Sequence, residues 1–478
     1  MCLPKDLKGV AIQRIVVIVG NILCLNFGIM LGITPAHLRL YMDEKTPLVH
    51  VASKEDASRT YGYLFASAAV SALICSLVTQ RFGPRVVLLL SGLLQIPSWF
   101  CVHFAYDIVH IYSSRIFGGL AAGATVVVLP IFIAEISEES NSGSLITTID
   151  QWRTLGMLIG FLLGQYLQYE YVSVVAVCIS CAFTMMFPFS QESPYFYMRK
   201  GDVPRLEKSL RWFRGVRRIS DRNRPEFLRE LDNFKNNMEK RAIVKTNVPQ
   251  PYLWKVALFT LVLIVGAQLS GIFVILAWSD EILANDVFVC FSPDASAMIL
   301  AFVQFAATTI TVWLAPVFRR KMLLFISAFI CGCASICLAI CVVTEVKGQL
   351  QWVASGLLLL HIFFANLGLY PLTSLIPSEM LSTKLRVRWT SISWSLSWLI
   401  TFILIQFYHY FSSMIGLHGY FVIFGAACVG VALLALFVLP ETRGKSLEEV
   451  QQIMGCGTGL AVAEKDVPQG GKIHLERY

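Results

Sequence analysis

Charged side chains are scarce in this chain of 478 residues. Asp, Glu, Lys and Arg together make up 15% of it, whereas apolar residues make up 56%. A water-soluble protein of this length needs more charge on its surface. The composition therefore excludes an ordinary soluble protein and predicts that the lipid bilayer is the main solvent.

Catalytic and metal-binding patterns are lacking as well. No Ser-His-Asp set, phosphate loop or pair of CxxC motifs with metal spacing stands in a suitable context. Most of the 13 cysteines fall inside apolar runs, where they behave as small hydrophobic residues. The first apolar run is too long for the core of a cleavable signal. We therefore expect no enzyme, no metal, no cofactor and no signal peptide.

Long apolar runs are what the sequence does contain. Each is about 20 residues long, enough to cross roughly 30 Å of hydrocarbon as a helix. The runs cover approximately residues 11–34, 61–80, 86–106, 109–134, 144–168, 171–190, 254–278, 296–315, 322–343, 352–377, 389–412 and 419–439. The fifth run is the weakest because it contains Asp150 and Arg153. The pattern predicts an all-α membrane protein with twelve transmembrane helices.

The net charge is +8, and the basic residues are concentrated in alternate loops. This distribution predicts the topology of the chain in the membrane. Lys and Arg collect near the N-terminus, around residues 81–85, in 191–253, at 319–321 and at 384–388, whereas the intervening loops are acidic. By the positive-inside rule, both termini and the 191–253 loop are cytoplasmic. We expect an integral membrane protein of the plasma membrane, a monomer, with the bilayer and not nucleic acid as its surroundings.

A short signature repeats where two apolar runs end. Gln191-Glu192-Ser193-Pro194 closes the sixth run, and Pro440-Glu441-Thr442-Arg443-Gly444 closes the twelfth. Internal repeats are how many secondary transporters are built, with the solute site between the halves. We predict an N-terminal half at 1–190, a linker at 191–253, a C-terminal half at 254–440 and a tail at 441–478. The linker is either a solvated connection with short amphipathic helices or a helical bundle that braces the halves.

Charges near the predicted inner face occur in both halves. Charges beside a low-dielectric region interact more strongly than in bulk water, so such a set can hold an inner gate closed. The alternative is that they only set the topology. The candidate gate residues are Arg85, Arg115, Glu135, Glu192, Arg319, Arg320, Glu379, Arg386 and Glu441.

Several motifs give the chain a resemblance to a known family. They include Gly83-Pro84-Arg85, Arg115 through Gly123, Gln268-Leu269-Ser270-Gly271, Ser378 through Arg386 and Pro440 through Leu447. With them the chain resembles the sugar-transporter family of the major facilitator superfamily, most of all the insect facilitated trehalose transporters. The resemblance implies two six-helix halves, a cytoplasmic helical loop domain and an inner gate built from the charges above.

The resemblance also indicates a solute site, with departures from the family pattern. Sugar hydroxyls that leave water must be re-bonded by polar groups in the cavity. Where the family places a first Gln and an Asn on the seventh span, this chain has Ala267 and Phe273. The residues carried over as candidate solute contacts are Asp150, Gln151, Gln268, Gln304, Asn366 and Trp398.

Asp150 is the least expected residue of this set, because an ionisable group inside a membrane helix is costly and indicates function. Arg153 follows on the same helix face, so Asp150 is a structural ion-pair partner, a solute-binding carboxylate or a proton-coupling site. The first span has Phe27-Gly28-Ile29-Met30 where proton-driven members of the family have a carboxylate.

We therefore expect facilitative uniport of a hexose or trehalose by alternating access. Two alternatives remain open: a carrier of a charged or amphipathic solute that uses Asp150, and a non-transporting sensor with the transporter fold.

Overall fold

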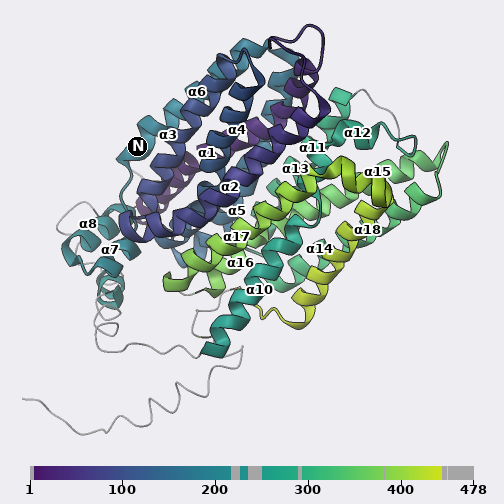
Figure 1. Ribbon diagram of the computed structural model, residues 1–478. Helices are drawn as coiled ribbons and strands as arrows, with labels where there is room; N and C mark the ends of the chain where they lie inside the picture. Colours follow the sequence, from purple (N-terminus) through teal and green to yellow (C-terminus); the bar gives the residue numbers. More distant parts are fainter. Residues whose placement is uncertain are drawn as a thin grey trace, which may run out of the picture.

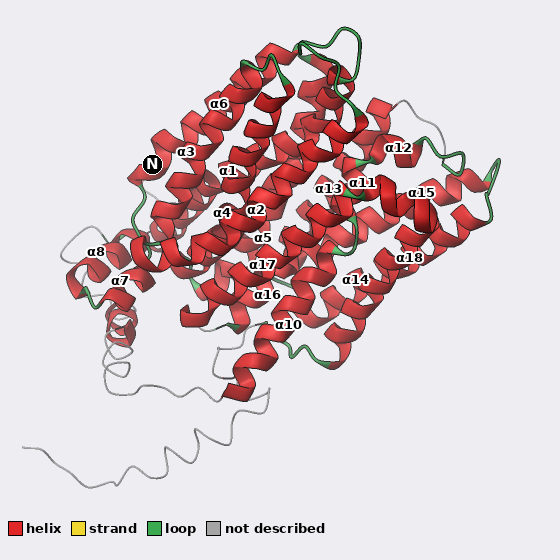
Figure 2. Cartoon of the chain, viewed as in Figure 1, coloured by secondary structure: helices red, strands yellow, loops and turns green. Residues whose placement is uncertain are grey.

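The computed structural model describes residues 5–216, 227–234, 250–288, 293–381, 383–443 and 449. Throughout these residues the regular structure is helical, and no strand occurs among them (Figure 2). The predicted all-α fold is confirmed. The predictions for residues 217–226, 235–249 and the tail from 450 lie outside the described residues.

The N-terminal half contains six long helices that follow one another up and down the bundle (Figure 1). They are α1 (Lys5–Tyr41), α2 (Lys54–Phe82), α3 (Pro84–His103), α4 (Ile108–Ile136), α5 (Glu139–Tyr166) and α6 (Tyr169–Met186), with the short 3-10 helix η1 (Phe187–Phe189) after the last. Each covers one of the first six predicted spans.

The C-terminal half also covers six predicted spans, but two of its spans are broken. Its elements are α10 (Gln250–Gln268), α11 (Ile272–Ala277), α12 (Ser279–Leu283), α13 (Pro293–Leu314), α14 (Arg320–Val343), α15 (Leu350–Phe364), the π-helical η3 (Ala365–Leu369), α16 (Tyr370–Met380), α17 (Thr383–Gln406) and α18 (Tyr408–Phe437). The seventh span breaks at Gly271, whose φ of 80° is left-handed, and the tenth contains the π-helical turn. Irregular backbone inside a membrane span is tolerated where it is buried in protein or lines a cavity.

Ten of the described helical stretches are long and apolar enough to cross a membrane by length and composition. The helices α5 and α17 are long enough but carry more polar residues, which agrees with the weakness of the fifth predicted span. The last two spans also begin at different residues from those predicted. Helix α17 ends at Gln406, and the final helix is kinked at Gly416, where φ is 68°.

The most extensive contacts between the halves are made by two pairs of helices. Helix α2 packs against α17, and α5 packs against α13. Within the N-terminal half, α1 and α5 lie unusually close because glycines face the neighbouring backbone. A Cβ atom at Gly28 would lie 2.0 Å from the Arg153 carbonyl oxygen, and one at Gly156 would lie 2.0 Å from the Leu25 carbonyl oxygen. Helix α5 is thereby held firmly in the N-terminal half.

The linker forms a small helical unit at one end of the bundle (Figure 1). Its described helices are α7 (Pro194–Lys200), α8 (Val203–Phe213) and residues 227–234, and they share a separate apolar core that includes Leu206, Leu210 and Leu231. Gln13 of α1 donates a hydrogen bond of 3.2 Å to the Phe213 carbonyl. The described contacts therefore favour the helical-bundle interpretation, docked on the N-terminal half. The face of the bundle that carries this unit is called the inner face below.

Candidate solute site and inner-face charge clusters

A cavity lies between the halves at the middle of the bundle. Its volume is about 20 Å3, which is room for a single water molecule and too little for a sugar. It is lined by Cys24, Phe27, Ala122, Thr125, Val126, Ile149, Asp150, Arg153, Phe273, Tyr370, Ser374, Trp394 and Trp398. Helices of both halves supply the walls, so the cavity can widen only if the halves or their side chains move apart.

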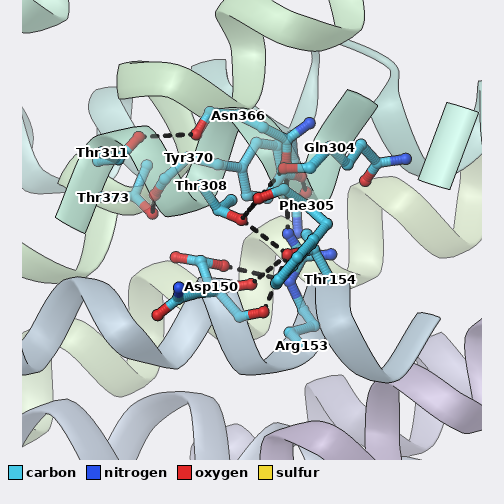
Figure 3. A network of polar contacts seen from close by, with 12 residues as sticks. Asp150, Arg153, Thr154, Gln304, Phe305, Thr308, Thr311, Asn366, Tyr370 and Thr373 are labelled. Carbon is cyan, nitrogen blue, oxygen red and sulfur yellow. Dashed lines mark hydrogen bonds and ion pairs between the residues drawn. The ribbon is translucent and has the colours of Figure 1, made fainter. Parts of the chain in front are cut away.

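Asp150 and Arg153 form an ion pair in the wall of this cavity. The Arg153 Nε atom lies 3.1 Å from Asp150 Oδ1, and the two residues are 5% and 8% exposed, respectively. Helical spacing brings them together, because residues i and i+3 share one face of α5. The two side chains are paired in the structure, as the ion-pair alternative requires, and this pairing leaves the other two alternatives for Asp150 open (Figure 3).

The Arg153 side chain also reaches from the N-terminal half to the C-terminal half. Its Nη2 atom lies 3.5 Å from Asn366 Oδ1, and its Cζ atom lies 5.7 Å from the ring centroids of both Phe273 and Tyr370. These distances allow cation–π attraction. The Nη1 atom is buried and has no hydrogen-bond partner. Arg153 therefore connects the halves at the cavity, a role that sequence reasoning did not assign, although the i+3 spacing placed it beside Asp150.

A polar seam continues between α5 and α13 (Figure 3). The Thr154 and Thr308 hydroxyls lie 2.7 Å apart, and Gln151 donates to the Thr309 hydroxyl at 3.3 Å. Thr311 donates to the Leu367 carbonyl in the π-helical turn at 2.5 Å. Because a π-helical turn leaves some carbonyls without their usual helical partners, side chains of α13 satisfy them here. The seam keeps the middle of the two halves in register.

The candidate solute contacts divide into two groups. Asp150 and Trp398 line the cavity, as expected, whereas Gln151, Gln268, Gln304 and Asn366 are not among its lining residues. These four amides lie in the surrounding helix contacts instead. The sequence does not reveal this, because spans buried on most sides lack a strong polar face that would fix their rotation.

Two of the amides retain unused polar atoms. Gln268 accepts a hydrogen bond from the Tyr370 hydroxyl, which leaves its Nε2 atom without a partner. Gln304 is fully buried, and neither of its amide atoms has a partner. Buried amides without partners are rare because the unpaired groups cost free energy. These two amides therefore keep hydrogen-bonding atoms that no described residue uses.

Aromatic rings form the apolar wall of the cavity. Trp398 of α17 stacks with Phe65 of α2 at 5.5 Å between centroids, and it also lies 5.4 Å from Phe273 and 5.6 Å from Trp394. Because Phe65 belongs to the N-terminal half and the other rings to the C-terminal half, this cluster also closes the space between them. Phe273 stands where the family has an Asn, so this wall is apolar at that position.

Aromatic residues close the outer side above the cavity. Tyr61 of α2 lies 6.3 Å from Trp278, which stacks on Tyr408 at 5.1 Å. An ion pair of 3.7 Å between Arg39 of α1 and Asp280 of α12 crosses between the halves at the same end. In this conformation the cavity has no wide path to the outer face through these residues.

On the inner face of the N-terminal half, two carboxylates hold helix ends. Glu192 Oε1 accepts the backbone N–H of Arg85 at 3.1 Å and that of Ser193 at 2.9 Å. Glu135 accepts the Ser193 hydroxyl at 2.5 Å and the Arg199 guanidinium at 3.2 Å. Burial raises the pKa of the Glu192 carboxyl to about 7, against the opposing effect of these N–H donors.

The C-terminal half repeats this arrangement. Glu441 Oε1 accepts the backbone N–H of Arg320 at 3.0 Å and that of Arg443 at 3.1 Å. Glu379 accepts the Thr442 hydroxyl at 2.5 Å and lies 3.4 Å from the Arg320 guanidinium. The repeated signature of the sequence therefore has the same structural use in both halves: its Glu caps the N-terminal end of a long helix, and its Ser or Thr bonds a second carboxylate.

The other candidate gate residues are placed less uniformly. Arg85 donates to the Pro188 carbonyl at 2.5 Å, and the exposed Arg319 stands just before α14. Arg386 donates to the Leu381 carbonyl at 3.1 Å and lies close enough to Glu135 of the other half for electrostatic attraction. These three residues lie on the inner face.

Arg115 does not lie with the inner-face charges, and the prediction that it does is wrong. Helix α4 runs from the outer face at Ile108 to the inner face, so Arg115 lies about two turns from the outer end. It is 1% exposed, interacts electrostatically with His37, Tyr41 and Tyr169, and makes no ion pair among the described residues. Its position early in the fourth span was the signal that could have located it.

Two helical halves around a closed central cavity define the major facilitator fold. A model of the family described as "Sugar (and other) transporter" matches residues 14–454, and the chain belongs to this family.

Similar proteins include the facilitated trehalose transporter Tret1 of Bombyx mori, 24% identical over 85% of this chain and 80% of that protein. Tret1 of Aedes aegypti is 25% identical over 78% of this chain and 47% of that protein. Among solved structures, the proton:xylose symporter XylE bound to 6-bromo-6-deoxy-D-glucose is similar, with a TM-score of 0.75, 18% identity and coverage of 94% of this chain and 100% of that chain. This likeness supports the fold.

Proposed function

We propose that this chain is a facilitative carrier that moves a sugar, a hexose or trehalose, down its gradient by alternating access. The observation that carries the proposal is the closed cavity between the halves, with polar groups on α5 and aromatic rings on α17. In a family of sugar transporters, such a cavity is where a solute binds while the halves rock around it. The names of the trehalose-transporting relatives favour this solute class.

Uniport is favoured by the groups that line the cavity. Helix α1 presents Phe27 and Cys24 to it and no carboxylate, and the one lining carboxylate, Asp150, is paired with Arg153. Proton exchange at Asp150 would therefore require this ion pair to break in each cycle. We propose that Asp150 and Trp398 contact the solute, and that Gln151, Gln268, Gln304 and Asn366 become available as the cavity widens.

Tracer uptake into proteoliposomes tests the proposal. Glucose and trehalose would each be supplied with and without a pH gradient, with protein-free vesicles as the control. We expect saturable uptake of at least one sugar that does not depend on the pH gradient. Uptake that stops without a proton gradient would contradict uniport, and the absence of uptake of either sugar would contradict the substrate class.

A second candidate function follows from the wall of the cavity. Apart from Asp150 and Arg153, its lining side chains are aromatic, aliphatic or small and uncharged. Such a wall also suits an organic cation, which Asp150 and the rings of Phe273 and Trp398 would hold. Competition by choline and by arginine in the same uptake assay distinguishes the two, because a sugar carrier is not inhibited by either.

We also propose that the inner-face charges act as a gate in a plasma-membrane monomer with both termini cytoplasmic. Arg386 of the C-terminal half lies near Glu135 of the N-terminal half, so Arg386→Gln and Glu135→Gln should each favour the inward-open state. Labelling of a cysteine introduced at Thr125, which lines the cavity, would report this from the inner side. Unchanged labelling in both variants would contradict the gate.

A further inference from the structure

Among the residues that line the central cavity, only Asp150 and Arg153 carry charge. Both are more than nine-tenths buried, and one Asp150 oxygen is bonded to Arg153 Nε. Among the described residues, the buried Nη1 atom of Arg153 has no hydrogen-bond partner, and its Nη2 atom has only the 3.5 Å contact to Asn366. Unused donors of a guanidinium thus stand directly beside a carboxylate at the cavity.

Adjacent donors and acceptors of this kind match one feature of sugars. Each hydroxyl both donates and accepts a hydrogen bond, so one hydroxyl can donate to a carboxylate while its neighbour accepts from a guanidinium. Hydrogen bonds to charged groups are also stronger than those between neutral groups. Of the other polar side chains of the lining, the Tyr370 hydroxyl already donates to Gln268 and the Thr125 hydroxyl donates to the Ala121 carbonyl. The indole N–H groups of Trp394 and Trp398 have no partner among the described residues, but they can only donate and carry no charge.

The positions where the sequence departs from the family pattern strengthen the argument. Ala267 and Phe273 cannot hydrogen-bond a hydroxyl through their side chains, so the polar recognition must come from elsewhere. Phe273 and Tyr370 flank the Arg153 guanidinium and leave an apolar surface for the C–H face of a ring. Among the described lining residues, the charged hydrogen-bonding groups are both on α5.

We propose that Arg153 is a solute-contacting, specificity-determining residue that binds a pair of neighbouring sugar hydroxyls together with Asp150. In the closed conformation its Nη2 atom contacts Asn366, and a solute hydroxyl takes the place of that contact. The inference rests on the proposed sugar transport. It adds a residue and a chemical requirement: the solute must present two adjacent hydroxyls to α5.

The test uses proteoliposomes of the full chain and whichever of glucose and trehalose the wild type carries, with single-deoxy analogues of that sugar. In the wild type, removing one of the contacted hydroxyls should raise KM by about tenfold or more. Arg153→Gln should raise KM for the parent sugar by a similar factor. The increase in KM caused by removing the hydroxyl and the increase caused by Arg153→Gln should not be additive, because the same hydrogen bond is missing in both cases. Arg153→Lys should restore part of the affinity.

A structural role for the ion pair gives a different result. The double variant Asp150→Asn/Arg153→Gln keeps a hydrogen-bonding pair without charge, and its Tm shows whether the protein still folds. The decisive variant is Arg153→Gln or, if that variant does not fold, the double variant. If it has the wild-type KM for the parent sugar, and each deoxy analogue raises KM as much as it does in the wild type, then Arg153 is structural. That result overturns the inference but leaves sugar transport standing. If the wild type carries neither sugar, the proposed function fails, and the inference fails with it.

Discussion

Substitution of Glu192 by Gln tests the electrostatics of the inner face. Glu192 is 5% exposed, and burial raises the pKa of its carboxyl from 4.5 to about 7. Between these values the native protein holds a proton that the unfolded chain releases, so the free energy of unfolding falls as the pH rises from 4.5 to 7. The shift corresponds to about 3 kcal/mol when complete.

Gln cannot ionise, and its amide oxygen can still accept the N–H groups of Arg85 and Ser193 that Glu192 binds at 3.1 and 2.9 Å. The variant should therefore lose the pH dependence and keep the helix cap. Near pH 4.5 the two proteins should be about equally stable. By pH 8 the variant should be the more stable by about 3 kcal/mol, because the ionised carboxylate is no longer buried.

Thermal unfolding of the detergent-solubilised proteins, measured in steps from pH 4.5 to 8, checks this expectation. Glu55→Gln is a suitable control, because the Glu55 side chain is 79% exposed and its loss should change Tm little at any pH. The quantity of interest is the difference in Tm between the Glu192 variant and the wild type. The reasoning would be refuted if this difference in Tm were constant across the range, or if the Tm of the wild type rose relative to that of the variant as the pH rises.

Three further predictions address the contacts between helices. The Cys75 sulfur lies 3.8 Å from the Ser391 hydroxyl across the halves. In the variant Ser391→Cys, oxidation by copper–phenanthroline should therefore form a disulfide that stops uptake until dithiothreitol is added. Uptake that continues after oxidation would show that α2 and α17 need not separate. Gly28→Ala should lower Tm sharply, since its Cβ would lie 2.0 Å from a backbone oxygen, whereas Gly356→Ala, with no atom within 4 Å, should raise stability by up to about 1 kcal/mol. Arg115→Met should raise Tm, because it removes a buried cation that has no carboxylate partner among the described residues; a lower Tm would show that the charge is neutralised in the protein.

The fold could be predicted from the sequence because the bilayer imposes a strong pattern on it. A run of about 20 apolar residues matches the thickness of the bilayer, and helices lie on every predicted run, although some of their ends differ from those predicted. Breaks inside spans were harder to place. Gly271 stands at the break of the seventh span, whereas the π-helical turn of the tenth span accepts a hydrogen bond from α13, a contact that no local sequence pattern indicates.

The candidate site could be predicted less well. Asp150 stood out because charge is costly in a membrane span, and it does line the cavity. Gln268, Gln304 and Asn366 carried amides at family positions, yet the rotation of each helix turns them into helix contacts. Rotation is decided by packing over the whole bundle, so one sequence without relatives does not determine it.

The inner-face clusters show how the halves are stiffened and where they meet. The hydrogen bonds of Glu192 and of Glu441 each stay within one half, so these carboxylates fix helix ends and do not by themselves join the halves. Two arginines of the C-terminal half do face the other half. Arg386 lies near Glu135, and Arg320 Nη2 would lie 2.6 Å from a Cβ atom at Gly143 of α5.

Closure of the inner face therefore has two parts. The capping carboxylates keep each half rigid, and the arginines together with the packing of α5 on α13 bring the rigid halves together. Because the arginine contacts are electrostatic and lie at the membrane edge, where water enters as the halves part, they weaken progressively on opening. The polar seam at the cavity keeps its short hydrogen bonds away from that edge, so we place the pivot of the rocking motion near Thr154 and Thr308 and the gate at the arginines.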